Sequence, residues 1–191
     1  MKTFNDELAQ HIAVMQSAAQ CSDVVQEAAK LLIDTFERGN KVLLCGNGGS
    51  AADAQHIAAE FVVRYEKKRR ALPAIALTTD SSILTAHAND FEFDSVFARQ
   101  IEALGSAGDT LIAISTSGNS KNILQAAHAA KAKGLNVIAL TGESGGALVD
   151  VATLTIKVPS TVTARIQETH ILIGHYWCGV VEGSSDVSKF A

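Results

Sequence analysis

A histidine and a carboxylate come close together in the stretch LLCGNGGSAADAQHIAAEF, residues 43–61. His56 and Glu60 stand four residues apart, so on a helix they would project side by side from one face. This spacing suits two ligands of one metal ion, or a base and the group that orients it. A polar surface pair is the alternative, but the neighbouring residues are small or apolar, and a carboxylate packed among them requires a partner.

A second polar stripe crosses the apolar segment TARIQETHILIGHYW near the C-terminus. Gln167, Ile171 and His175 recur at intervals of four, so they form one line along a helix, and His170 lies on another face. On spacing alone, His175 fits a functional role as well as it fits an ordinary place in the core or on the surface. We expect Arg165 to pair with a nearby carboxylate or with the bound substrate.

Four hydroxyl side chains crowd the hexapeptide STSGNS, residues 115–120, between an apolar run and a helical segment. The N-terminus of a helix presents free N–H groups and partial positive charge, which favour an anion. An ordinary N-cap explains one serine here, but it does not explain the other hydroxyls or Gly118. No lysine of the P-loop kind precedes Ser115, so we do not expect nucleotide hydrolysis. The stretch predicts a phosphate-binding loop.

The glycine-rich turn after Cys45 also has the composition of a phosphate loop. Residues 46–51 fit the loose pattern GxGxxA of dinucleotide sites, which is a weak signal by itself. The acidic residue that should close the second strand about 20 positions later is not clearly present, since Asp80 comes too late. We therefore do not expect a nicotinamide cofactor.

Alternating short strands and helices must position these groups. Each apolar run is about five residues long and apolar on both faces, as in strands that helices cover on two sides. The runs are KVLLC (41–45), PAIALT (73–78), TLIAIS (110–115), NVIAL (136–140) and TLTIKV (153–158). The expected helices are a pair within 3–38, then 50–65, 81–88, 93–104, 119–133 and 146–150, and a last one over 162–182. The alternation predicts an open parallel sheet, with ligands beyond the carboxyl ends of its strands.

Composition excludes several classes of protein. The chain has 191 residues, 47% of them hydrophobic, 19% charged and with a net charge of −4, so we expect a globular protein and no nucleic-acid partner. No apolar run approaches the roughly 18 residues of a membrane span. Three scattered cysteines indicate reduced thiols in a cytosolic protein. We interpret the basic run Lys67–Arg70 as a solvated loop, with a grip on an anionic substrate as the alternative.

Taken together, these motifs resemble those of the phosphoheptose isomerases, a single-domain branch of the sugar isomerase (SIS) fold. The motifs are CGNGGSAADAQHIAAEF, HANDF (87–91), ISTSGNS, ALTG and ARIQETHILIGH, and the resemblance covers nearly the whole chain. It implies an α/β fold: a three-layer, doubly wound, flavodoxin-like sheet of five parallel strands with two N-terminal helices and a long C-terminal helix. It also implies one domain over 1–191, with residues 1–38 used in oligomerisation.

The resemblance further implies an activity and its setting. The family converts sedoheptulose 7-phosphate to D-glycero-D-manno-heptose 7-phosphate, which supplies the ADP-heptose of the lipopolysaccharide core. Its members are cytoplasmic, metal-dependent homotetramers. Two alternatives stay open: a non-catalytic SIS protein that binds the replication initiator, and an isomerase of another sugar phosphate. A phosphosugar sensor is less well supported, because such regulators usually carry a DNA-binding domain for which this chain has no room.

Site residues carry over from the resemblance as well. Glu60 would be the catalytic base and His175 the acid, and one Zn²⁺ ion would be held by His56, Glu60, Gln167 and His175. The residues expected to bind the substrate are Asn47, Gly48, Gly49, Glu60, Asn89, Asp90, Ser115, Thr116, Ser117, Ser120 and Gln167. Some members have an aspartate where this chain has Ala164, which puts a role for a carboxylate at that position in doubt.

Helix geometry leads us to expect a site shared between chains. Gln167 and His175 are eight residues apart, which is about 12 Å along a straight helix. The terminal helices are also more apolar than a monomer surface tolerates, which indicates burial between subunits. We therefore expect Glu60 of one subunit to work with His175 of another.

Overall fold

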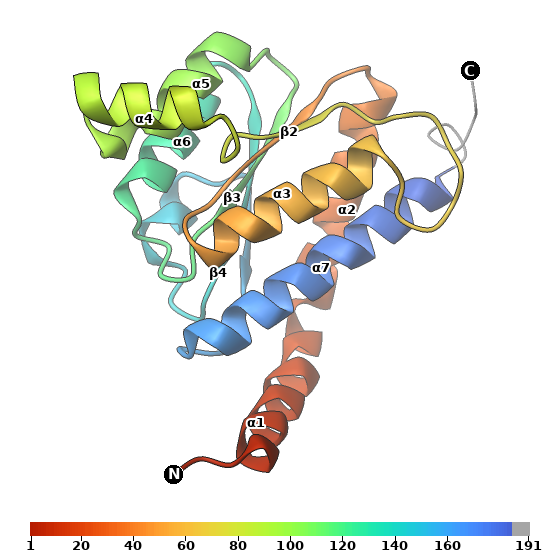
Figure 1. The fold of residues 1–191 in the computed structure, drawn as a ribbon. Coiled ribbons are helices and arrows are strands. Elements are labelled where there is room, and N and C mark those ends of the chain that lie inside the picture. The colour runs from red at the N-terminus through yellow and green to blue at the C-terminus, as the bar shows by residue number, and fades with distance from the viewer. Residues whose placement is uncertain (185–191) are drawn as a thin grey trace.

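Five parallel strands form the centre of the molecule, as the sequence predicts (Figure 1). The computed structural model describes residues 1–184. The strands are β1 Val42–Cys45, β2 Ala74–Ala76, β3 Thr110–Ile114, β4 Asn136–Thr141 and β5 Leu154–Lys157. They are ordered β2-β1-β3-β4-β5, which confirms the doubly wound, flavodoxin-like sheet. Every residue of β1 and β3 is buried, because helices cover both faces of the sheet.

The helices agree with the expected segments to within a few residues. The α-helices are α1 Phe4–Ser17, α2 Ser22–Glu37, α3 Gly49–Val62, α4 Ser81–Asp90, α5 Val96–Leu104, α6 Lys121–Ala132 and α7 Thr163–Gly183. Short 3-10 helices are η1 Ala18–Cys21, η2 Phe93–Ser95 and η3 Gly146–Asp150. One apolar core packs α2, α3 and α7 on one face of the sheet, and a second packs α5 and α6 on the other. These three layers are the predicted architecture.

Helix α1 extends from the body of the protein and carries no buried residue (Figure 1). Thr3 and Asp6 begin it with a reciprocal capping box. Arg165 of α7 donates hydrogen bonds to the Glu7 carbonyl and to the carboxylates of Glu7 and Glu168, which confirms its expected pairing with a carboxylate. The role of residues 1–38 in oligomerisation and the single domain over 1–191 stay predictions, and residues 185–191 of that range lie outside the described part.

Helices α3 and α7 lie side by side on the same face of the sheet (Figure 1). They approach closely where Gly174 of α7 faces Ile57 of α3, since a Cβ at position 174 would overlap the Ile57 side chain. At their N-terminal ends, a Cβ on Gly49 would lie 2.6 Å from Gln167 Nε2. The two helices therefore run parallel, because early residues of α3 face early residues of α7 and later residues face later ones.

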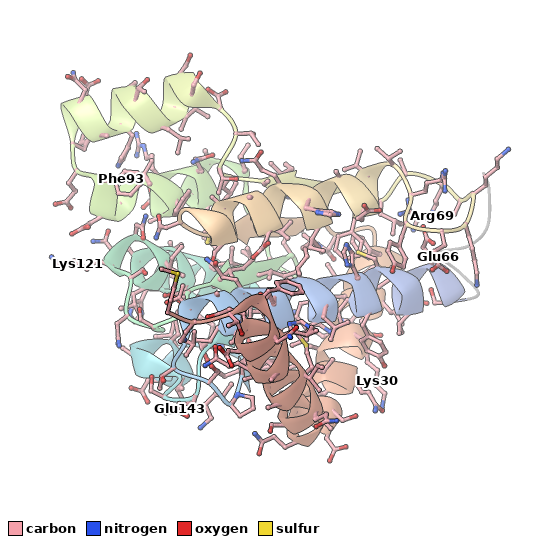
Figure 2. All side chains as sticks on the ribbon, turned by 60° about the horizontal axis from the view of Figure 1, so that its bottom comes forward. Lys30, Glu66, Arg69, Phe93, Lys121 and Glu143 are labelled. Carbon is pink, nitrogen blue, oxygen red and sulfur yellow. The ribbon has the colours of Figure 1, made fainter. Side chains whose placement is uncertain are left out.

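The segment between α3 and β2 carries the basic run, and our interpretation of a solvated loop is wrong for Arg69. The side chains of Arg69 and Glu182 are each 1% exposed, and Arg69 Nε lies 3.3 Å from Glu182 Oε1. Glu182 lies in the last turn of α7. Figure 2 shows that end of α7 beside the segment that carries Glu66 and Arg69. A buried guanidinium requires such a partner, which is more than 100 positions away in the sequence. Lys67 and Lys68 are exposed, as expected.

Within residues 1–184, none of the helices combines the length and the apolar character needed to cross a bilayer.

Candidate active site

His56, Glu60 and His175 form one cluster between α3 and α7. His56 Nε2 lies 3.3 Å from Glu60 Oε1 and 3.2 Å from His175 Nε2. One nitrogen or oxygen of each residue lies within 4.8 Å of the others. The predicted sharing of one helix face by His56 and Glu60 is confirmed, and α7 adds His175 to the pair.

The donor set of this cluster fits a divalent metal ion. The Nε2 atoms of His56 and His175 are 3.2 Å apart. At this separation the two nitrogens can share one hydrogen, or both can bind the same cation. Glu60 adds an oxygen, and two nitrogens with one carboxylate oxygen are a common ligand set for zinc in catalytic sites. The side chain of His56 is half-exposed, so the cluster remains open to a ligand from solvent.

The expected division of Glu60 and His175 between two chains is wrong for this pair. Both residues belong to the same cluster of a single chain. The reason is the parallel alignment of α3 and α7, which places His175 opposite His56. Helical periodicity alone does not reveal which two helices of a chain pack together.

Gln167 lies closer to the N-terminal ends of α3 and α7 than the cluster does. Its side-chain amide rests against Gly49, where the missing Cβ leaves the space that the amide occupies. Gly49 precedes His56 by seven residues and Gln167 precedes His175 by eight, in keeping with parallel helices. The expected role of Gln167 as a metal ligand and substrate contact stays a prediction.

The STSGNS loop joins β3 to α6 and borders a polar cavity. Ser115 Oγ donates a hydrogen bond to Ser120 Oγ at 3.0 Å, and the Asn119 N–H donates to Ser117 Oγ at 3.1 Å. Gly118 has a φ of +67°, and a side chain there would overlap the Gly145 carbonyl. The cavity has a volume of about 290 Å³. The predicted place of the loop, between a strand and the start of a helix, is confirmed.

Other residues of this cavity escaped the sequence analysis. The loops after β4 and β5 complete its wall with Ser144, Ser160, Thr161 and Thr163. The stretch PSTVT, residues 159–163, carries hydroxyls between a strand and a helix, just as STSGNS does. Applying the same criterion to each such junction would have found these residues.

The remaining predicted substrate contacts lie apart from the cluster. The side-chain amides of Asn47 and Asn122 exchange two hydrogen bonds, at 2.9 and 2.8 Å, which tie the glycine turn to α6. Asn89 Nδ2 donates to Asp90 Oδ1 at 2.8 Å, and both residues border a shallow hollow on α4. Helix α4 lies on the far side of α3 from α7 in Figure 1. The substrate-binding roles of these residues stay predictions.

Three groups on or beside α3 and α7 have raised pKa values. Burial raises the pKa of Asp53, and the nearby His56 lowers it by less. Asp53 Oδ2 is buried and has no hydrogen-bond partner within residues 1–184. Burial raises the pKa of the Cys45 and Cys178 thiols to about 12. All three cysteines are free and buried, so these two thiols are protonated and unreactive at neutral pH.

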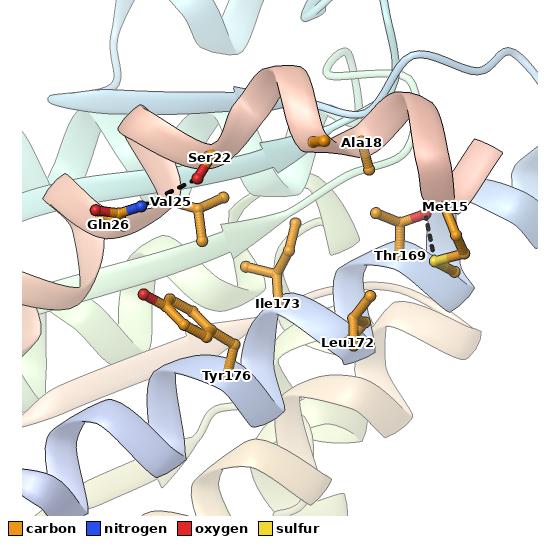
Figure 3. A pocket seen from close by; sticks show the side chains of 10 residues that line it. Met15, Ala18, Ser22, Val25, Gln26, Thr169, Leu172, Ile173 and Tyr176 are labelled. Atoms are coloured by element: carbon orange, nitrogen blue, oxygen red, sulfur yellow. Dashed lines mark hydrogen bonds between the residues drawn. The ribbon is translucent and has the colours of Figure 1, made fainter. Parts of the chain in front are cut away.

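An apolar groove separates the N-terminal helices from α7 (Figure 3). Its volume is about 370 Å³, and Met15, Val25 and Ile173 are among its lining residues. Leu172 and Tyr176 at its edge are 52% and 42% exposed. None of the described residues that line the groove carries a carboxylate or an imidazole, so this lining offers surface for packing and not for chemistry.

The fold and the site together define a SIS-domain protein, and the family model described as "SIS domain" matches residues 4–142. The phosphoheptose isomerase of Rhodospirillum rubrum is 54% identical over 162 residues, which cover 85% of this chain and 86% of the relative. The chain therefore belongs to the phosphoheptose isomerase family.

Solved structures of two further relatives agree with this assignment. The phosphoheptose isomerase of Neisseria gonorrhoeae superposes with a TM-score of 0.88 at 44% identity, covering 93% of this chain and 96% of that one. The phosphoheptose isomerase from Francisella tularensis has a TM-score of 0.89 at 38% identity, covering 96% of this chain and 100% of that one. The similarity thus extends over nearly the full length of each chain.

Proposed function

We propose that this protein converts sedoheptulose 7-phosphate to D-glycero-D-manno-heptose 7-phosphate, in the cytoplasm, as a step toward the heptose of lipopolysaccharide. The observation that carries the proposal is the cluster of His56, Glu60 and His175 in a chain whose relatives are named phosphoheptose isomerases. A non-catalytic initiator-binding protein would have no need of this cluster.

The phosphate of the substrate is held at a distance from the reacting carbons. Hydroxyls of Ser115, Thr116, Ser117 and Ser120, together with N–H groups at the start of α6, bind its oxygens. Binding energy at this end holds C1 and C2 in place at the other, which can contribute several of the roughly 7–11 kcal/mol that positioning makes available. Thr116 and Ser117 line the hydroxyl-rich cavity, which supports this arrangement for these two, whereas Ser115 and Ser120 are paired with each other and are not among its lining residues.

Glu60 moves the proton between the two carbons. Its carboxylate takes the proton from C1 of the ketose, which gives an enediol, and returns it to C2 of the aldose. His175 acts as the acid and exchanges a proton with the sugar oxygens. His56 Nε2 lies 3.3 Å from Glu60 Oε1 and 3.2 Å from His175 Nε2, so the side chains of Glu60 and His175 flank one point, which supports a base and an acid that act at the same site.

Metal binding completes the proposal. His56, Glu60 and His175 would hold a zinc ion, with Gln167 as a further ligand after a movement of its side chain. When bound there, the ion supplies Lewis-acid stabilisation of the negative charge that develops on the sugar oxygens. The nitrogen and oxygen donors within 4.8 Å of one another support this role.

A homotetramer is the proposed assembly. The apolar groove and the exposed Leu172 and Tyr176 support burial of α7 against another subunit. Phe4, Leu8 and Ile12 of α1 are exposed as well and would be covered in the same way.

An isomerase assay with sedoheptulose 7-phosphate, fructose 6-phosphate and ribulose 5-phosphate in competition tests the proposal. The wild-type protein should prefer the heptose, and removal of metal by a chelator should abolish the activity. Glu60→Gln should bind substrate but lose kcat and the entry of solvent deuterium, because the amide cannot accept the proton. Glu27→Gln, an exposed site on α2, is the matched control and should behave as wild type.

Each arm of this assay has an outcome that contradicts part of the proposal. Faster turnover of a pentose or hexose phosphate would refute the substrate. Full activity without bound metal would refute the metal while leaving acid–base catalysis in place. Deuterium entry at the wild-type rate in Glu60→Gln would assign the base to another residue.

A further inference from the structure

Glu182 is a buried carboxylate with an unusual set of partners. Its oxygens accept hydrogen bonds from three consecutive backbone N–H groups, those of Tyr65, Glu66 and Lys67, at 2.6, 2.9 and 2.9 Å. Arg69 Nε lies 3.3 Å from the same carboxylate. Glu182 thus fixes the segment that follows α3 to the last turn of α7.

The charge of Glu182 suits this role. Burial alone would raise its pKa, but the three backbone hydrogen bonds and the nearby Arg69 outweigh burial, and the pKa is lowered. The side chain is therefore a carboxylate at neutral pH, and hydrogen bonds to a charged acceptor are stronger than those to a neutral one.

The segment held by Glu182 touches both sides of the His56–Glu60–His175 cluster. The ring of Tyr65 stacks on the imidazole of His175, with centroids 5.5 Å apart and planes at 18°. Arg69 Nη2 donates a hydrogen bond of 2.6 Å to the backbone carbonyl of Glu60. Glu182 is thus connected to His175 through the ring of Tyr65, and to the backbone of Glu60 through Arg69.

We propose that Glu182 is a positioning residue, which holds Tyr65 against His175 and Arg69 against the backbone of Glu60. The inference rests on the proposed function, in which His175 and Glu60 act together on the sugar. His175 is only part-buried, and His56 is its hydrogen-bond partner among the described residues, so the stack on Tyr65 restricts the rotation of its ring. A displacement of about 1 Å at such a group can lower the rate by about 100-fold.

A pair of carboxylate-to-amide variants separates positioning from stability. Glu182→Gln removes the charge and presents an amide to N–H donors, so kcat should fall roughly 10–100-fold while KM changes less than about threefold. Asp109→Asn is the matched control. Asp109 has a side chain that is 1% exposed and is paired with Lys41 Nζ at 2.6 Å. It also accepts the N–H groups of Lys41 and Ser106, which lie outside α3 and α7. This control should lower the melting temperature and leave kcat at the wild-type level.

Variants of Tyr65 test the stack without disturbing the buried ion pair. Tyr65→Phe keeps the ring and should retain most of the wild-type kcat. Tyr65→Leu removes the aromatic face and should lose kcat to a similar degree as Glu182→Gln. Because Tyr65 is only part-buried, both variants are expected to fold. Equal kcat in Tyr65→Leu and Tyr65→Phe would overturn the proposal, even if Glu182→Gln fails to fold.

NMR spectra of histidine-labelled protein, recorded without substrate, provide a readout that does not depend on turnover. The His175 signal, assigned by its loss in His175→Gln, should show the upfield shift caused by a stacked ring. This shift should persist in Tyr65→Phe and Asp109→Asn and disappear in Tyr65→Leu and Glu182→Gln. An unchanged shift in Glu182→Gln would refute the positioning role of Glu182. A protein that is inactive on every sugar phosphate but shows these shifts would refute the proposed function alone.

Discussion

His170 is a histidine that takes no part in the cluster, and its burial makes it a source of acid instability. The side chain is 1% exposed, and its Nε2–H donates to the Thr141 carbonyl at 3.1 Å. Burial lowers its pKa from 6.5 to about 4, although the hydrogen bond to Thr141 opposes this shift. The His170 ring is therefore neutral in the folded protein at neutral pH.

This shift predicts a loss of stability on mild acidification. Below pH 6.5 the unfolded chain binds a proton at His170 that the folded protein does not bind until about pH 4. The free energy of unfolding should therefore fall between pH 6.5 and 4, by about 3 kcal/mol from this residue. Urea unfolding at a series of pH values, at fixed protein concentration, measures the change. His170→Gln, which retains an N–H donor, should have a flatter profile; identical slopes for the two proteins would contradict the prediction.

At the scale of single residues, contacts between residues close in the sequence could be predicted, whereas contacts between residues far apart in the sequence could not. His56 and Glu60 could be paired from their spacing, because one helix turn fixes their relation. The burial of Arg69 could not be predicted, because its partner Glu182 lies in a helix more than 100 positions away. Asn47 shows the same limit, since its amide pairs with that of Asn122, 75 positions away in the sequence.

At the scale of elements, the loop between β3 and α6 carries a prediction about affinity. Ser117→Ala and Ser120→Ala should each raise KM, because a lost hydrogen bond to a charged group costs roughly 1.5–3 kcal/mol. Ser120→Ala should also lower stability, since the buried Ser115 loses its partner. Steady-state kinetics with sedoheptulose 7-phosphate, with exposed Ser106→Ala as the control, provide the measurement. Unchanged KM in both loop variants would exclude this loop as the phosphate site.

The elements themselves were predictable to within a few residues. Strands buried on both faces produce unbroken apolar runs, as β1 and β3 do. The expectation of burial on both faces is wrong for the edge strands β2 and β5, which are partly exposed because each has a neighbouring strand on one side only. The side-by-side packing of α3 and α7 could not be predicted, because helical periodicity gives an apolar face without naming the helix that covers it. The error about a site divided between chains has this origin.

At the scale of the whole molecule, the placement of the cluster predicts how mixed oligomers behave. Glu60→Gln and His175→Gln subunits, unfolded and refolded together, should stay inactive, because every chain carries one defect in its own cluster. Refolding wild type with His175→Gln, the control, should give activity in proportion to the wild-type share. Recovered activity in the first mixture would show that neighbouring chains exchange these residues.

The architecture of the whole molecule could be predicted from the sequence more completely than the covering of its surfaces could. Alternating strands and helices with short connections leave few arrangements other than a doubly wound sheet. The apolar terminal helices indicated covered surface, and the groove in Figure 3 lies between them.

Gly174 contributes no side-chain atom to the His56–Glu60–His175 cluster, but its contact with Ile57 helps to set the distance between the two helices that carry the cluster. A methyl group at position 174 would overlap Ile57 Cδ1, so either the Ile57 side chain would have to turn away or α7 would have to shift from α3, which would also move His175 from His56. For protein design, the combined volume at positions 57 and 174 is therefore a means of adjusting the width of the cluster. Such a change would alter the size of an ion that the cluster could hold, while His56, Glu60 and His175 themselves stay unsubstituted.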